Sequence, residues 1–219
     1  MDSTKDVKSL LEAQGVQNYY DSYISGNRIQ VPGKDSIFKL PAGAVYGPYV
    51  DGNNFTLAKL IGTRVQPDTV KIRHILIATM QQDQQTGQAY QVRDTAVAYK
   101  LIDSLRTAIR NGTSFDSIVV KFSEDPGSKE KGGVYEGVPS GQMVPDFNEF
   151  IFGNPVGAKG IVKTEFGYHY IEILSAKGAS TAYKVAYLSN PITASSETDN
   201  NANNEAAQFA ATSNDQKNI

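Results

Sequence analysis

The sequence predicts an α+β domain in the middle of the chain, in which strands lie on either side of a group of helices. Alternation of apolar and polar residues indicates strands at 70–77 and 168–174, with weaker strand patterns at 134–138 and 160–163. Apolar residues at helical spacing indicate three helices between the outer strands. The order of strand, helices, short strand, helix and two strands indicates a compact α+β domain.

Three helices are expected inside this domain. The longest covers 93–110 and ends at an Asn-Gly pair. A second fits 114–122, where Thr113 and Asp116 form a capping pair at its start. A third fits 146–152, which follows a proline and stops at a Gly-Asn-Pro sequence.

The chain has only two histidines, His74 and His169, and each falls on the apolar face of a predicted strand. A lone histidine in such a place is usually a satisfied core residue. Two histidines on matching faces of neighbouring strands can meet inside the fold, with one ring donating a hydrogen bond and the other accepting it. We therefore expect a His74–His169 pair that stays largely neutral.

Four short motifs occur in order along the same region. They are Arg73-His74-Ile75-Leu76, the run Ser-Glu-Asp-Pro-Gly-Ser-(x)3-Gly-Gly at 123–133, Gly-Gln-Met-Val-Pro-Asp-Phe at 141–147, and Thr-Glu-Phe-Gly-Tyr-His at 164–169. This ordered set resembles the parvulin-type peptidyl-prolyl cis/trans isomerases, and among them the multi-domain SurA/PpiD-like bacterial foldases. The resemblance covers about residues 69–178. It implies a four-stranded, mostly antiparallel sheet packed by about four helices.

The sequence departs from the family pattern in three places. Val134-Tyr135 stands where the family commonly has Asp-Leu, and Val144 stands where phosphate-directed members carry glutamine. Phe166 replaces a residue that is often small. We expect Phe166 either to extend the apolar wall of the substrate slot or to close it in part.

Rotation about an X–Pro bond crosses a barrier of about 20 kcal/mol and needs no covalent intermediate. The chemistry calls for an apolar seat for the proline ring and few ionised groups. Met143 and Phe147 are the candidates for this seat, because a flexible thioether beside an aromatic ring suits it. The resemblance assigns Met143 and Phe147 the same role, and Tyr135 completes the slot. The alternative is that they are ordinary core residues.

The polar residues of the motifs are expected below this seat. The resemblance places His74 and His169 beneath the reaction site, where they orient it without transferring a proton. It aligns Asp125 with a position that carries cysteine or aspartate near the substrate carbonyl, and Thr164 with a residue bonded to the same network. Asp125 also begins an Asp-Pro-Gly sequence, so a structural role in a turn stays open.

A second signal indicates that the flanks repeat parts of this domain. The pattern Ile-Phe-x-x-Pro-x-Gly-Ala occurs at 37–44 and again, 114 residues on, at 151–158. Lys-Ile-x-His at 71–74 loosely matches Lys-Val-x-Tyr at 184–187, which lies 113 residues on. Two similar offsets indicate tandem copies of one unit.

The repeat predicts three parts of the chain. Residues 1–68 would be the end of a degenerate parvulin-like copy, 69–178 the isomerase domain, and 179–219 the start of a following segment. In this alignment Phe55 matches His169 and Tyr187 matches His74, so only the middle copy keeps its histidines.

Composition narrows the partners and cofactors. A formal net charge of −2 provides no basic field for nucleic acid. The absence of cysteine and the presence of only two histidines argue against a zinc site, so no metal or cofactor is expected. No apolar run approaches the length of a membrane span. The polar stretch after Met1 suggests an excised fragment. The resemblance implies a periplasmic or cell-envelope protein, whose full length could include a membrane anchor.

Three polar segments complete the prediction. Residues 78–91 contain no Lys or Arg, whereas phosphate-directed parvulins place a basic cluster there, so no phosphate preference is expected. Gln81–Gln88 is expected to be a loop, and 193–205 a linker. Residues 205–211 are expected to form a helix without a packing partner.

These observations predict a peptidyl-prolyl isomerase that acts on unfolded or extended polypeptides as a periplasmic folding factor for secreted or outer-membrane proteins. The alternative is a catalytically weak or inactive parvulin-fold chaperone module that holds peptides, which would suit the histidine-free flanks. A hydrolase is disfavoured because the chain has no Gly-x-Ser-x-Gly motif.

Overall fold

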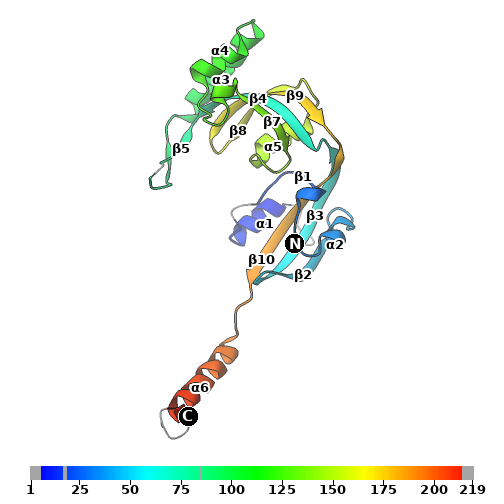
Figure 1. The fold of residues 1–219 in the computed structure, drawn as a ribbon, viewed down its shortest axis with the longest axis vertical. Helices are drawn as coiled ribbons and strands as arrows, with labels where there is room; N and C mark the ends of the chain where they lie inside the picture. The colour runs from blue at the N-terminus through cyan, green and yellow to red at the C-terminus, as the bar shows by residue number, and fades with distance from the viewer. Residues whose placement is uncertain (1–5, 17–18, 84, 214–219) are drawn as a thin grey trace.

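A computed structural model describes residues 6–16, 19–83 and 85–213 and divides them into two lobes (Figure 1). Each lobe is built on one four-stranded sheet in which every pair of neighbouring strands is antiparallel. We call the lobe that contains both histidines the histidine lobe, and the lobe made from the two flanks the flank lobe. The predicted α+β class is confirmed.

The sheet of the histidine lobe has the strand order β7-β4-β9-β8. The strands are Val134–Pro139 (β7), Thr69–Ala78 (β4), Gly167–Lys177 (β9) and Lys159–Thr164 (β8). Its helices are Thr95–Arg110 (α3), Phe115–Phe122 (α4), the short 3-10 helix Lys129–Lys131 (η2) and Pro145–Gly153 (α5). Each predicted strand and helix of this lobe is present, with ends that differ by at most three residues.

Local sequence explains where the helices begin. The side chain of Asp94 accepts hydrogen bonds from the first turn of α3. Ser114 caps α4 by accepting from the backbone N–H of Ser117, so the expected cap at Thr113 was wrong by one residue. Pro145 opens α5, where its missing N–H costs no hydrogen bond.

Helices cover both faces of this sheet. On one face α3 and α4 bury Ile75 and Ile77 of β4, and on the other face α5 buries Ile72 of β4 and Ile171 of β9. Alternation along β4 therefore puts His74 on the α5 side, in line with Ile72. The sheet and α5 together position the site.

Two short strands form a small hairpin where the sequence had predicted a loop. Met80–Gln82 (β5) pairs with Ala89–Gln91 (β6), and Figure 1 shows the hairpin projecting from the side of the histidine lobe. The loop prediction at Gln81–Gln88 was therefore wrong at Gln81 and Gln82, which lie in β5.

The flank lobe joins segments from before and after the histidine lobe. Its sheet has the order β1-β10-β3-β2. The strands are Ile24–Ser25 (β1), Ser180–Pro191 (β10), Asn54–Gln66 (β3) and Val45–Asp51 (β2), and its helical segments are Val7–Ala13 (α1), Gly26–Arg28 (η1, a 3-10 helix) and Lys34–Phe38 (α2). The sequence had not indicated that the two flanks pair with each other.

Each face of the flank sheet has its own core. Ile37 of α2 packs with Leu60 and Val185 on one face, and Leu11 of α1 packs with Ala186 on the other. Helix α2 thus covers the face that α5 covers in the histidine lobe.

The repeated sequence pattern makes the same backbone hydrogen bonds in both lobes. The N–H of Gly43 donates to the carbonyl of Leu60 at 2.7 Å, and the N–H of Leu60 donates to Ala44 at 3.1 Å. In the histidine lobe the same two bonds join Ile173 to Gly157 and Ala158, at 2.8 Å and 3.0 Å. The shared pattern therefore has a structural counterpart.

Strand register extends this correspondence and corrects one match. Val185 faces Leu60 next to a bulge at Ile61 of β3, as Ile72 faces Ile173 next to a bulge at Leu174 of β9. Counting along each strand, Tyr187 takes the place of His74, as expected, while Thr56 takes the place of His169. The expected match with Phe55 was wrong because the flank lobe has one more residue between Ala44 and Leu60 than the histidine lobe has between the equivalent positions.

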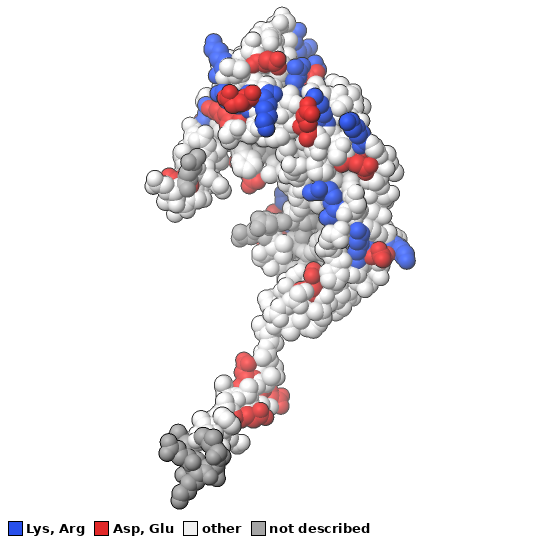
Figure 2. Space-filling view, in the orientation of Figure 1, with Lys and Arg blue, Asp and Glu red and all other residues white. Residues whose placement is uncertain are grey.

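The chain leaves the flank lobe in a helix, Ser196–Ser213 (α6), which extends away from both lobes and has no buried residue (Figure 1). The linker expected to run to residue 205 therefore ends at Ser196. Within the described ranges, no helix combines the length and apolar character needed to cross a membrane. Figure 2 shows that charged side chains gather over the helices of the histidine lobe and along the outer edge, while the hollow between the lobes is mainly uncharged on the face in view.

Candidate active site

A chain of four polar side chains runs through the histidine lobe beneath α5. The Nδ1 atoms of His74 and His169 lie 3.2 Å apart. Thr164 Oγ1 lies 2.8 Å from His169 Nε2, and His74 Nε2 lies 3.0 Å from Asp125 Oδ2. The structure thus brings together His74, Asp125, Thr164 and His169, which the sequence had placed in one polar floor.

One arrangement of protons satisfies every contact in this chain when both rings are neutral. An ionised Asp125 can only accept, so His74 carries its proton on Nε2 and accepts at Nδ1 from His169. The Nε2 atom of His169 then accepts from the hydroxyl of Thr164, which in turn accepts from the N–H of Phe166 at 3.2 Å. All the donors point toward Asp125, so the chain holds the rings in fixed orientations.

Three donors converge on Asp125. Besides His74, the hydroxyls of Ser128 and Tyr135 donate to the same Oδ2 atom at 2.5 Å and 3.0 Å. Burial raises the pKa of Asp125, but the hydrogen bonds from His74 and Ser128, the attraction to His74 and the bond from Tyr135 outweigh burial and hold this pKa well below its usual range. Burial and the neighbouring carboxylate raise the pKa of Tyr135 to about 12, so its hydroxyl stays a donor.

Both imidazoles are buried, with 3% of His74 and 4% of His169 exposed. Burial, reinforced by the neighbouring His74, lowers the pKa of His169 to about 3, although Asp125 acts in the opposite direction. A ring that resists protonation suits a support for an uncharged reaction site.

The ring of Phe147, which lies on α5, packs against both imidazoles. It meets His169 and His74 edge to face, with centroids 5.2 Å and 5.4 Å apart. Phe147 is only 3% exposed, whereas Met143 and Tyr135 are half-buried against the same apolar cluster. The three residues expected to seat proline are therefore grouped above the polar chain, with Phe147 the deepest.

Comparison with known proteins agrees with the resemblance that the motifs had indicated. A family model for the PPIC-type PPIASE domain matches residues 55–177, more than half of the chain. This chain belongs to the PPIC-type peptidyl-prolyl isomerase family.

Relatives of the PPIC-type domain include chaperones. Chaperone SurA of Chromohalobacter salexigens is 35% identical over 147 residues, which cover 64% of this chain and 32% of that protein. Chaperone SurA of Pseudomonas putida is 30% identical over 151 residues, covering 65% and 32%. The chain thus spans about a third of the length of these curated relatives. Among solved structures, the peptidylprolyl isomerase PrsA of Bacillus anthracis matches at 28% identity and a TM-score of 0.39, over 52% of this chain and 43% of that one.

Two glycines of the PPIC-type domain let the backbone close around the histidines. Gly133 has a φ of 76° and accepts a 2.9 Å hydrogen bond from the N–H of His74, and a Cβ there would collide with the carbonyl of His74. Gly167 has a φ of 144°, and a Cβ there would collide with the carbonyl of Ile77 in the same way. Both glycines belong to motifs that the sequence had singled out.

Phe166 is 44% exposed. Its backbone N–H donates to the hydroxyl of Thr164, and its carbonyl accepts from the N–H of Thr79. The expectation that Phe166 extends the apolar wall of the substrate slot or closes it in part stays a prediction.

Sequence reasoning missed several residues that hold this site. Ser128 lies in the quoted motif, so its spacing from Asp125 was an available signal, but it had received no role. Arg93 grips Glu124 with two 2.8 Å hydrogen bonds, and Glu124 accepts from the N–H of Ala78 at 2.7 Å. This ties the segment that carries Asp125 to the end of β4.

The flank lobe also contacts the PPIC-type domain at α5. Asn148, fully buried, accepts from the N–H of Gly141 at 2.8 Å and donates to Ser22 and to the carbonyl of Tyr23. The hydroxyl of Tyr20 donates to the carbonyl of Met143 at 2.8 Å. The loop that carries Met143 and the helix that carries Phe147 are therefore held by contacts within the histidine lobe and by contacts with the flank lobe.

Proposed function

We propose that this chain accelerates cis/trans rotation of X–Pro bonds in unfolded or extended polypeptides. The observation that carries the proposal is the buried histidine pair, hydrogen-bonded between Thr164 and Asp125 and in contact with Phe147. Such a site offers an apolar seat and a rigid polar floor, and rotation about a tertiary amide requires neither a nucleophile nor a metal.

The energetic requirement is modest. Lowering the barrier of about 20 kcal/mol by about 6 kcal/mol gives an acceleration of about 10⁴-fold. A dry site contributes because the twisted amide has less charge separation than the planar amide, and a rigid site contributes by selecting the twisted geometry. In this proposal Tyr135, Met143 and Phe147 seat the ring, while His74, Asp125, Thr164 and His169 orient the seat without passing a proton.

The proposal includes a lack of phosphate preference. The hairpin at 80–91 contains no Lys or Arg, and the nearby Arg93 already binds Glu124 with both ends of its guanidinium. Peptides that differ only in a phosphate on the residue before proline should be turned over within about threefold of each other. Much faster exchange of the phosphorylated peptide, measured by NMR, would overturn this specificity.

The biological setting is proposed from the relatives. Proteins called chaperone SurA share the matched region, and we propose that this chain is part of a periplasmic or cell-envelope folding factor, SurA-like or PpiD-like, that meets secreted or outer-membrane clients. In the same proposal residues 1–68 and 179–219 are parts of degenerate copies of the domain at 69–178.

A second function, holding chains without catalysis, has one observation in its favour. Phe147 is 3% exposed, so the deepest part of the seat is closed in this structure. A module that only holds peptides would use the surrounding apolar surface instead.

Refolding separates the two functions. A client whose slow refolding phase is limited by an X–Pro bond should refold faster with catalytic amounts of the protein. Slower or arrested refolding, which needs stoichiometric amounts, would support holding and contradict the isomerase.

A further inference from the structure

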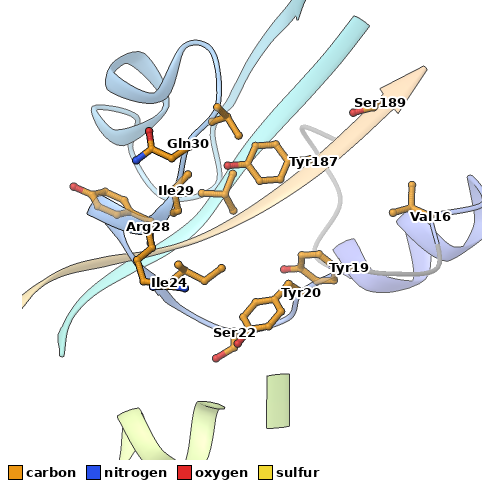
Figure 3. A pocket seen from close by; sticks show the side chains of 13 residues that line it. Val16, Tyr19, Tyr20, Ser22, Ile24, Arg28, Ile29, Gln30, Tyr187 and Ser189 are labelled. Carbon is orange, nitrogen blue, oxygen red and sulfur yellow. The ribbon is translucent and has the colours of Figure 1, made fainter. Parts of the chain in front are cut away.

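An apolar cavity lies in the flank lobe. It has a volume of about 420 Å³ and is lined mainly by tyrosines and aliphatic side chains, among them Tyr19, Tyr20, Ile29, Tyr183, Val185 and Tyr187. Figure 3 shows Tyr19 and Tyr20 on one side of the cavity, with Ile29 and Tyr187 across from them.

The cavity occupies the place in the flank lobe that the seat occupies in the histidine lobe. Val185 and Tyr187 correspond to Ile72 and His74 by strand register. Counting back from the repeated Ile-Phe pair of α2 and α5, Ile29 corresponds to Met143.

The same count places Gly33 where the histidine lobe has Phe147, and the ring of Tyr46 occupies the space that a side chain at Gly33 would need. The cavity is thus lined by counterparts of the proline seat, but neither the histidines nor the Phe147 ring has an equivalent side chain at the matching positions.

The lining selects an uncharged, largely apolar occupant. Arg28 is the one charged side chain among the described residues that line it, and no carboxylate lines it. The hydroxyl of Tyr187 is buried and has no hydrogen-bond partner among the described residues. Burial, together with Tyr49 and Asp51, raises the pKa of Tyr187 to about 12, so the hydroxyl keeps its proton and adds no charge to the lining.

The cavity is accessible to an extended chain and is connected to the site above it. In the described part of the chain, β1 pairs with β10 only at Ala182 and Tyr183, so the edge of β10 beside the cavity is not covered by β1. An exposed strand edge is a common seat for an extended peptide. Tyr20, whose ring lines the cavity, donates its hydroxyl to the carbonyl of Met143, so one residue contacts both places.

We propose that this cavity is a second binding site for the same polypeptide client, and that it takes an apolar or aromatic side chain of an extended segment next to the X–Pro bond. The proposal rests on the proposed function in that it assumes a polypeptide client, but it does not require catalysis. The proposal predicts that a peptide long enough to reach both sites binds more tightly than a peptide that contains only the X–Pro dipeptide.

The test uses two capped peptides in a glycine and serine background. One carries a single phenylalanine and no proline, and the other carries the phenylalanine and an Ala-Pro bond. Gln30→Trp fills the cavity from an exposed position on its rim, and Val120→Trp places the same side chain on the exposed face of α4 as a matched control. Affinity is measured by calorimetry, and the bound position by shifts in the NMR spectrum of the labelled protein.

The proline-free peptide should bind the unmodified protein and shift resonances of Ile29 and Tyr187. Gln30→Trp should weaken that binding by about tenfold or more, and Val120→Trp should leave it unchanged. No binding of this peptide, or shifts confined to the histidine lobe, would overturn the proposal. Binding without faster Ala-Pro exchange would overturn the isomerase function and leave this second site supported.

Discussion

The two lobes share a strand order, a bulge and a set of hydrogen bonds, yet only one of them contains a polar chain. In the histidine lobe His74 and His169 lie between Thr164 and Asp125. At the corresponding positions of the flank lobe, Tyr187 has no partner for its hydroxyl among the described residues, and Thr56 bonds to Ser189. The sheet therefore sets where a site can form, and a few side chains decide whether it orients a reaction or simply receives a chain.

The largest expected effect comes from making the seat of the histidine lobe resemble the flank lobe. Phe147→Ala removes a ring that packs on both histidines and should lower the free energy of unfolding by about 3–5 kcal/mol. Met143→Ala, at a half-buried position, should cost only about 1–2 kcal/mol and chiefly reduce turnover. Denaturant unfolding of both variants measures the difference, and equal costs would show that Met143 is as much a core residue as Phe147.

Replacing the histidines by their flank-lobe counterparts tests the polar chain. The double change His74→Tyr and His169→Thr should lower catalysed X–Pro exchange by about 100-fold or more, because the floor no longer fixes the seat. Val120→Tyr, at an exposed position of α4, serves as the control and should keep full activity. Circular dichroism establishes that the double variant is folded. Exchange within a few-fold of the unmodified protein would show that the polar chain is dispensable.

Acid should destabilise the histidine lobe selectively. The pKa of His169 is about 3 in the folded chain and about 6.5 when unfolded, so the unfolded state binds the extra proton between these values. The free energy of unfolding should therefore fall as pH drops from about 6.5 toward 3, by up to about 1.4 kcal/mol per pH unit.

Asp125 adds a second loss of stability at lower pH. Its folded pKa is depressed, so its stabilisation is present above the unfolded value of about 3.8 and disappears as pH falls through the folded value. Unfolding curves across this range, compared with those of His169→Gln, measure the histidine contribution. An unchanged pH slope in the variant would contradict it.

The smallest expected effect concerns the contact between the lobes. Tyr20→Phe removes the hydroxyl that donates to the carbonyl of Met143, at a cost of about 1 kcal/mol. We expect a rise of a few-fold in KM for a long X–Pro peptide, with kcat little changed, because the seat is less firmly placed. Tyr90→Phe, on the exposed strand β6, is the matched control. A change in kcat alone would mean that Tyr20 acts on the chemistry rather than on placement.

Most of the histidine lobe could be predicted from the sequence, because its signals are local. Apolar periodicity located the helices and strands, and alternation placed His74 and His169 on facing sides before their contact was known. Motif spacing brought Asp125 and Thr164 into the same site.

The flank lobe and its contacts with α5 could not be predicted, because they depend on contacts between segments that are far apart in the sequence. Pairing of β3 with β10 joins residues that lie on either side of a whole lobe, and no local pattern reports such pairing. His169 aligns with Thr56 instead of Phe55 because of the strand register, which the bulges and hairpins set. The support that Asn148 receives from Ser22 and Tyr23 is likewise visible only once the lobes are assembled.

NMR exchange spectroscopy of an unphosphorylated X–Pro peptide, with a catalytic amount of the protein, tests the central claim most directly. The account predicts faster cis/trans exchange with the unmodified protein and near-background exchange with the His74→Tyr, His169→Thr variant. Peptide shifts without faster exchange in the unmodified protein would contradict it and would leave a module that holds chains without isomerising them.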